Sequence, residues 1–92
     1  MLNYTLLPEN LRDGMRQYIE HGILPGSFLM ACLENDFVGA VGLASPQRFE
    51  YLFAVASFLY NELPAQTYAE SPWGSPDAVQ RWMTTRRQEA NR

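Results

Sequence analysis

The sequence predicts an all-α protein, a compact single-domain bundle of four to five short helices. Two observations support this fold class: apolar residues recur at helical spacing, and Pro and Gly stand where such stretches begin and end. A third is that the strict apolar–polar alternation of a strand is missing. The 92 residues suffice for one domain, and a composition of 47% hydrophobic and 18% charged residues is typical of a globular core.

The first helix is predicted over residues 8–21. Pro8 suits a first helical turn because its fixed φ is already helical and it needs no amide donor there. One apolar stripe at spacings of four, three and one is formed by Leu11, Met15, Tyr18 and Ile19. Gly22 supplies the left-handed residue that ends many helices, and we expect Ile23 to fold back toward Tyr18 beyond it.

The second helix is predicted over residues 27–34, with Gly26 or Ser27 as its cap. It is apolar on nearly all sides, which predicts a place in the centre of the bundle. Asn35 and Asp36 break the chain after it, because Asn tolerates the left-handed conformation and Asp caps a new helix.

The third and fourth helices are predicted over residues 37–43 and 46–62. The third contains Gly39 and Gly42, which disfavour a helix, and we expect them to let a neighbouring helix approach closely. Pro64 stops the fourth helix. One apolar face is expected along it, formed by Phe49, Leu52, Phe53, Ala56, Leu59 and Tyr60.

A loop over residues 63–75 and a fifth helix over residues 76–88 complete the chain. Ser75 is expected to cap this helix, and its core-facing residues are predicted to be Val79, Trp82 and Met83. The loop is longer than most helix connections, and loops of that length are often functional. Its aromatic residues, Tyr68 and Trp73, either anchor an interface or fold down as a lid on the bundle.

Charge is distributed unevenly along the chain, which has ten acidic residues and seven arginines, for a net charge of −3. Residues 1–80 sum to −6 and residues 81–92 to +3. An acidic body repels phosphate, so we expect it to meet basic residues of a partner and not nucleic acid. The basic end contains Arg81, Arg86, Arg87 and Arg92. These arginines either contact phosphate or an acidic partner, or lie in solvent at the negative end of the last helix dipole.

Catalytic and metal-binding chemistry is not expected. His21 is the single histidine, and its place beside Gly22 favours a structural contact with the last helical carbonyls over a general base. Cys32 lies in an apolar run, which predicts a packed side chain and not a nucleophile. One histidine and one cysteine are too few for a typical metal site, and the glycines of residues 37–42 lack the spacing of a nucleotide-binding loop. We therefore predict no enzyme activity, no metal and no cofactor.

Four stretches of the sequence follow a shared pattern. They are residues 18–29 (Tyr-Ile-Glu-His-Gly-Ile-Leu-Pro-Gly-Ser-Phe-Leu), 33–36 (Leu-Glu-Asn-Asp), 58–64 (Phe-Leu-Tyr-Asn-Glu-Leu-Pro) and 73–76 (Trp-Gly-Ser-Pro). Through them the chain resembles a group of short proteins of tailed phages and prophages of Gram-negative bacteria, over roughly residues 4–83. Residues 38–45 and 69–72 depart from the pattern. The resemblance implies a phage or prophage setting and no particular activity.

The function expected in such a setting is inhibition of a host complex, because small acidic phage proteins without catalytic groups are often anti-defence inhibitors, with anti-CRISPR proteins as one class. We predict a non-enzymatic interaction protein that binds a host protein or ribonucleoprotein complex. The alternative is a small DNA-binding or transcription-modulating protein that uses the arginine-rich last helix. Partner contacts are predicted at Glu9, Asp13, Glu20, Glu50, Glu62, Tyr68, Trp73, Arg81, Arg86 and Arg87.

The compartment and the assembly state follow from the same features. No uncharged run reaches the about 20 residues that span a bilayer, and the N-terminus lacks a secretory signal. A single cysteine fits a reducing compartment, so the predicted location is the host bacterial cytoplasm, with no membrane contact. Excess apolar surface on the helices at 27–34 and 46–62 leaves both a monomer and a homodimer open.

Overall fold

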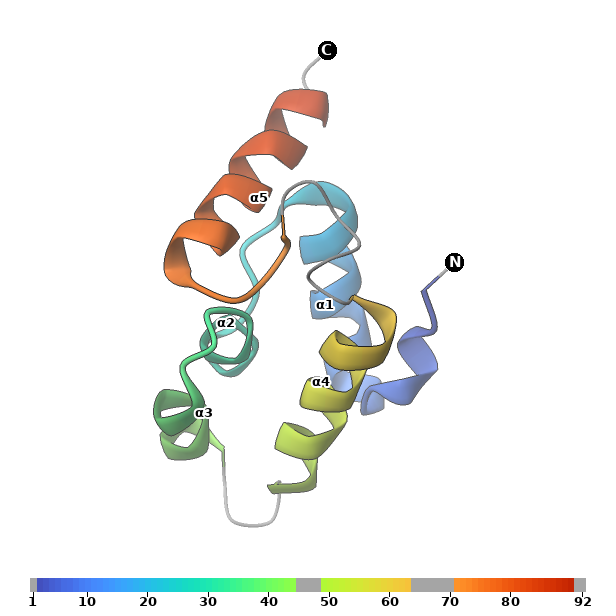
Figure 1. Cartoon of the computed structure of the whole chain (residues 1–92). Coiled ribbons are helices and arrows are strands. Elements are labelled where there is room, and N and C mark those ends of the chain that lie inside the picture. The colour runs from blue at the N-terminus through green and yellow to red at the C-terminus, as the bar shows by residue number, and fades with distance from the viewer. Residues whose placement is uncertain (1, 45–48, 64–70, 91–92) are drawn as a thin grey trace.

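The computed structural model describes residues 2–44, 49–63 and 71–90, and it confirms the all-α prediction (Figure 1). Within these residues there is no strand, and a short 3₁₀ helix, η1 (Tyr4–Leu6), precedes five α-helices. The α-helices are α1 (Glu9–His21), α2 (Ser27–Leu33), α3 (Phe37–Leu43), α4 (Phe49–Glu62) and α5 (Pro76–Ala90). The radius of gyration is 12.6 Å, close to the roughly 12 Å expected of a compact domain of this length.

The helix boundaries lie within two residues of the prediction wherever the structure describes them. Helix α1 begins at Glu9 and not at Pro8, because Pro8 has an extended ψ of 144° and is the N-cap. Helix α5 continues two residues past residue 88 to Ala90. The predicted start of the fourth helix at 46–48 and the loop residues 64–70 lie outside the described residues.

The C-terminus of α1 has the predicted glycine cap. Gly22 adopts a left-handed conformation with φ of 68°. Its N–H donates to the Tyr18 carbonyl at 2.9 Å, and the N–H of Ile23 donates to the Gln17 carbonyl at 3.3 Å. The Gly22 bond is that of an αL cap, in which the N–H of the first residue past the helix pairs a carbonyl that the helix end would otherwise leave unpaired. The Ile23 side chain itself remains 51% exposed.

The starts of α3 and α5 also follow the prediction. Asn35 is left-handed, with φ of 63°, and turns the chain between α2 and α3. Asp36 Oδ1 then accepts the N–H of Gly39 at 3.0 Å, so this carboxylate caps α3. At the start of α5, Ser75 Oγ accepts the N–H of Ala78 at 3.1 Å. Both caps satisfy amide groups that have no partner within the helix.

The prediction that Gly39 and Gly42 allow close helix approach is wrong. A Cβ at Gly39 would collide with the Asp36 carboxylate that caps the same helix, and a Cβ at Gly42 would meet nothing within 4 Å. Close approach occurs at Gly22 instead, where a Cβ would lie 2.7 Å from the Met83 carbonyl oxygen. The glycine that permits tight helix contact is therefore the cap of α1, which packs against α5.

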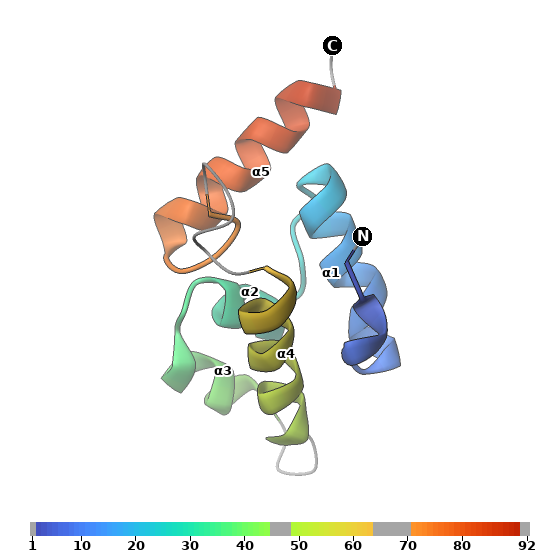
Figure 2. The same cartoon turned by 45° about the vertical axis from the view of Figure 1, so that its right-hand side comes forward.

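The core cluster is formed by apolar side chains from α1, α2, α4 and α5 and from the residues that follow η1 and α4, and α3 has one buried residue, Ala40. Helix α2 contacts α1, α3 and α4, in line with its predicted central place, and Figure 2 shows it near the middle of the molecule. The core residues are Leu7, Met15, Tyr18, Ile19, Leu29, Leu33, Val55, Phe58, Leu59, Leu63, Val79, Trp82 and Met83. The core faces predicted for α1 and α5 are thus confirmed.

The N-terminal segment, which the sequence left unassigned, ties α1 to α4. The Asn3 N–H donates to Glu62 Oε1 on α4 at 2.7 Å. The Tyr4 ring stacks on Phe58 of α4 with centroids 5.6 Å apart, and its hydroxyl donates to Glu20 Oε2 on α1 at 3.2 Å. Two acidic side chains are therefore used within the fold.

Helix α5 packs against α1. The buried indole N–H of Trp82 donates to the carbonyl of Ile19 at 3.2 Å, which fixes the two helices side to side. The last turns of α5 extend beyond α1 and carry the C-terminal end away from the other helices (Figures 1 and 2). The longest dimension of the chain is 42 Å, against 25 and 23 Å across.

Candidate interaction surface

A largely apolar pocket of about 310 Å³ lies between α4 on one side and α2 and α3 on the other. Its walls are formed by Cys32, Asn35, Asp36, Phe37, Ala40, Leu52, Ala56, Leu59, Tyr60 and Trp73. The four α4 residues stand four, three and one positions apart in the sequence, so they share one side of that helix. The volume is at the lower end of the range in which small ligands or single side chains are held.

Three aromatic residues of α3 and α4, the two helices that face each other across this pocket, are exposed, and we call Phe37, Phe53 and Tyr60 the aromatic rim. Their exposed fractions are 70%, 78% and 74%. Phe37 and Tyr60 form part of the pocket wall. Phe53 precedes Ala56 by three residues and Tyr60 by seven, so all three lie on one stripe of α4. Single exposed apolar residues are common, but a group of large ones beside an apolar pocket marks an interaction site.

The apolar face predicted for α4 is only partly buried. Phe53, Ala56 and Tyr60 belong to that predicted face, and all three are exposed. The side of α4 that is fully buried carries Val55, Phe58 and Leu59. Helix α4 is apolar around most of its circumference, so helical spacing alone does not show which side is buried. The feature of the sequence that could have indicated an exposed apolar side is the number of apolar residues, which is larger than one core face requires.

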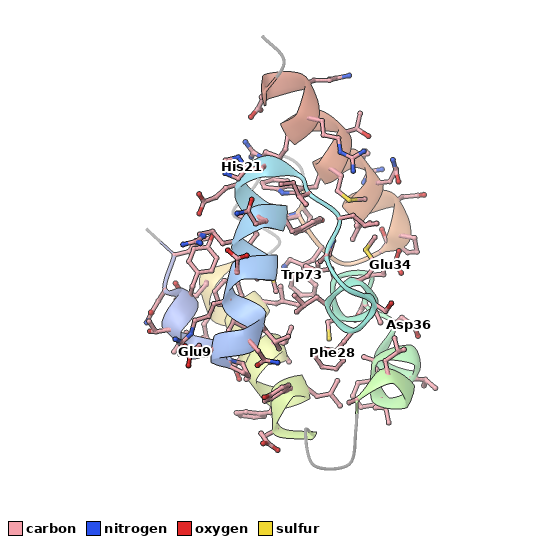
Figure 3. All side chains as sticks on the ribbon, turned by 180° about the vertical axis from the view of Figure 1, so that it is seen from behind. Glu9, His21, Phe28, Glu34, Asp36 and Trp73 are labelled. Atoms are coloured by element: carbon pink, nitrogen blue, oxygen red, sulfur yellow. The ribbon has the colours of Figure 1, made fainter. Side chains whose placement is uncertain are left out.

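Trp73 forms the inner wall of the pocket and holds the segment before α5 in place. Its indole N–H donates to the Leu63 carbonyl at 2.6 Å, and the N–H of Gly74 donates to the Leu33 carbonyl at 2.8 Å. Figure 3 shows Trp73 in the middle of the molecule. Trp73 was expected either to anchor an interface or to fold down as a lid on the bundle, and its contacts match the lid. Tyr68 lies outside the described residues.

Tyr18 supports the same segment from α1. Its buried hydroxyl donates to the Pro72 carbonyl at 2.6 Å. Burial, together with the nearby charge of Glu34, raises the pKa of Tyr18 well above its usual value. The side chain is therefore a neutral hydrogen-bond donor across the ordinary pH range, and its role is to position the segment that contains Trp73.

Cys32 is half-buried in the pocket wall. Burial raises the pKa of its thiol to about 11, which keeps it protonated at neutral pH. This matches the packed, unreactive cysteine that the sequence predicts. Among the described residues, no group of three or more His, Cys, Asp or Glu side chains is placed to hold a metal ion. Nor is any helix of that part of the chain long and apolar enough to cross a membrane.

The five acidic residues predicted to contact a partner differ in the contacts that they already make within the chain. Glu20 and Glu62 accept hydrogen bonds from the N-terminal segment. Asp13 pairs with Arg16 one turn away, at 2.9 Å between Oδ1 and an Arg16 terminal nitrogen. Glu9 and Glu50 are exposed in the first turns of α1 and α4, where a negative charge interacts favourably with the helix dipole.

The three arginines predicted to contact a partner differ in the contacts that they make within the chain. The Arg86 guanidinium lies over the Trp82 ring, 4.1 Å from its centroid, and pairs with Glu89 at 2.8 Å. Its Nε is buried and lacks a hydrogen-bond partner within the described chain. Arg81 and Arg87 are exposed on α5. Arg86 therefore serves helix packing first, and the other two remain candidate contacts.

No protein-family model matches the chain, and neither a curated protein nor a solved structure is significantly similar to it. The aromatic rim and its pocket are therefore the features from which a function can be argued. They join residues of α2, α3 and α4 with the segment before α5.

Proposed function

We propose that the protein is a non-enzymatic interaction protein whose activity depends on contact with other protein chains. The observation that supports this most directly is the aromatic rim, three rings about three-quarters exposed beside an apolar pocket. Aromatic side chains supply a large share of the binding energy at protein interfaces. Burying such surface against another chain is favourable by roughly 25 cal/mol per Å².

The environments of the nucleophilic and basic side chains support binding over catalysis. The Cys32 thiol is protonated because burial raises its pKa, and the Tyr18 hydroxyl is engaged with the Pro72 carbonyl. His21 is exposed at the end of α1, at a distance from the Trp73 side of the pocket (Figure 3). The pocket thus offers apolar contact and an unreactive thiol.

The narrower proposal is that the target is a host protein or ribonucleoprotein complex in the cytoplasm, inhibited in the manner of phage anti-defence proteins such as anti-CRISPR proteins. It is supported by the resemblance to short phage proteins, by the small size and by the net charge of −3. The exposed carboxylates of Glu9 and Glu50 would face basic residues of that target. Contacts of this kind act mainly on association rate and specificity.

The test is affinity capture from host lysate, followed by binding measurements with the purified captured complex. We expect one stable complex with the wild-type chain. The double variant Glu9→Gln/Glu50→Gln is expected to weaken binding by about 2–10-fold, mostly through slower association at low salt. The matched control is Asp77→Asn, which removes an exposed first-turn carboxylate of α5 and should bind as wild type. Absence of a stable complex, or equal binding by the double variant, would contradict the proposal.

A titration of the chain with duplex DNA distinguishes this proposal from the DNA-binding alternative. Removing residues after 80 would also remove Trp82 and Met83 from the core, so substitutions are the better tool. Salt-dependent duplex binding that is lost in Arg81→Ala/Arg87→Ala would support that alternative. We expect little duplex binding by either chain.

A further inference from the structure

We infer that the chain forms a two-fold symmetric homodimer in which one stripe of α4 packs against the same stripe of a second copy. This outer stripe of α4 consists of Phe53, Ala56, Ser57 and Tyr60. The inference goes beyond host binding: it names the chain that covers the aromatic rim. It rests on the proposal that the rim is a contact with another chain, and on no property of the host target.

The outer stripe of α4 is complementary to itself. Phe53 and Tyr60 are seven residues apart, two helical turns, with Ala56 and Ser57 at the midpoint. When two copies cross antiparallel about an axis at that midpoint, Phe53 of one copy lies opposite Tyr60 of the other. Each exposed ring then gains an aromatic partner. The small side chains at the crossing point let the two helices approach to the usual 8–10 Å.

Charge does not oppose this contact, although the chain is acidic. Helix α3 has no charged residue, and α4 carries Glu50 and Glu62 near its two ends. In the antiparallel arrangement Glu50 lies opposite Leu63 of the second copy, and Glu62 lies opposite Tyr51. Carboxylates therefore do not meet across the axis, and the middle of the contact is free of charged side chains.

The exposed area is of the size that a modest dimer needs. At their observed exposure, the three rings of the aromatic rim present roughly 350–550 Å² per copy. A standard interface buries about 800 Å² per partner. The rings thus supply about half of that area or more, and flanking residues of α3 and α4 supply the rest. Interfaces of this size span dissociation constants from about micromolar to picomolar, and we expect the weak, micromolar end for this contact.

Sedimentation equilibrium of the purified full-length chain tests the dimer. Between about 1 and 200 μM, a range that brackets a micromolar constant, the mass should rise from 10.5 kDa toward twice that value. Phe53→Asp should weaken association at least about 30-fold, as loss of a central aromatic contact does. The matched control is Leu24→Asp in the connector before α2, where the side chain is 60% exposed. Circular dichroism should show an unchanged helix content for both variants.

Cysteine cross-linking tests the position of the axis. Under mild oxidation, Ser57→Cys should give a disulfide-linked dimer, because residue 57 lies next to the axis. Gln80→Cys, at an exposed position of α5, should link no faster than wild type, which retains Cys32. A mass of 10.5 kDa at every concentration would overturn the dimer. So would a dimer unaffected by Phe53→Asp, and capture of a host protein by the rim of a monomeric chain would assign that surface to another partner.

Discussion

The two ends of the molecule differ in how completely they bury their apolar residues. At the α1–α5 contact, the predicted core residues are buried, a buried indole bonds a helix carbonyl, and a glycine admits the opposite backbone. On the α3–α4 side, apolar residues line a pocket and three aromatic rings remain in water. Figure 2 shows α5 at one end and α3 with the start of α4 at the other.

Under the proposed dimer, stability and association depend on separate parts of the chain. A contact that is fully packed and hydrogen-bonded contributes to the free energy of unfolding of one chain. An apolar surface that one chain leaves exposed contributes only when a second chain covers it. Substitutions at the α1–α5 contact should therefore change unfolding, and substitutions on the outer stripe of α4 should change association.

The largest effect on stability is expected at Gly22. Gly22→Ala adds a Cβ 2.7 Å from the Met83 carbonyl and 2.8 Å from the Arg86 Cβ, at a φ of 68° that disfavours other residues. The strain and the overpacking together should lower the free energy of unfolding by about 2–5 kcal/mol. Urea titration measures this change. A loss below about 0.5 kcal/mol, the range of ordinary surface substitutions, would show that the contact is looser than described.

The alkylation rate of the Cys32 thiol measures how far this side chain is buried in the pocket wall. Its pKa is raised to about 11 from the ordinary 9.0, so at pH 8 the thiolate fraction in the folded chain is lower by about 100-fold. Alkylation by iodoacetamide should be slower than in the urea-unfolded chain by at least that factor. Because burial favours the protonated thiol, the folded-state rate should keep rising as the pH approaches 11. Similar rates in folded and unfolded chains at pH 8 would contradict the buried placement.

Tyr18→Phe should lower the free energy of unfolding by about 1–3 kcal/mol, because it leaves the buried Pro72 carbonyl without its donor. The same change should loosen the segment that contains Trp73. Thermal unfolding and the fluorescence maximum of the two tryptophans measure both effects. Unchanged stability with an unchanged emission spectrum would mean that the hydroxyl contributes nothing to holding the segment.

The smallest effects are expected in α3, where two glycines form a matched pair. Gly42→Ala meets only open space and should stabilise the chain by about 0.5–1 kcal/mol through helix propensity. Gly39→Ala gains the same propensity but displaces the Asp36 cap, which is worth about 1 kcal/mol. Its net change should therefore be near zero. Equal stabilisation by both variants would show that the cap contributes little.

Local chemistry made most of the fold predictable from the sequence. The Gly22, Asp36 and Ser75 caps are encoded within a few residues of the helix ends that they stabilise, so they could be predicted without tertiary structure. The same holds for the buried stripes of α1 and α5, which have one apolar side each. The structure of the N-terminal segment could not be inferred, because its contacts with Phe58 and Glu62 join it to a helix in the second half of the sequence.

The candidate site was less predictable, for a physical reason. Helix α4 is apolar on several sides, and periodicity does not indicate which side the neighbouring helices cover. The sequence therefore placed Phe53 and Tyr60 on one apolar face with Leu59, whereas the structure buries Leu59 and exposes the two rings. The hydrogen bonds of Glu20 and Glu62 could not be inferred either, because their donors, Tyr4 and Asn3, lie distant in sequence. In both cases the missing information is a contact between distant segments.

A dilution series followed by aromatic ¹H–¹³C NMR tests the division between the two ends most directly. Over about a hundredfold dilution through the micromolar range expected for the contact, the Phe53 and Tyr60 ring signals should shift as the outer stripe of α4 becomes exposed. The Trp82 ring signals at the α1–α5 contact should stay constant. Constant Phe53 and Tyr60 signals throughout, or equal shifts at Trp82, would contradict a self-association confined to α4.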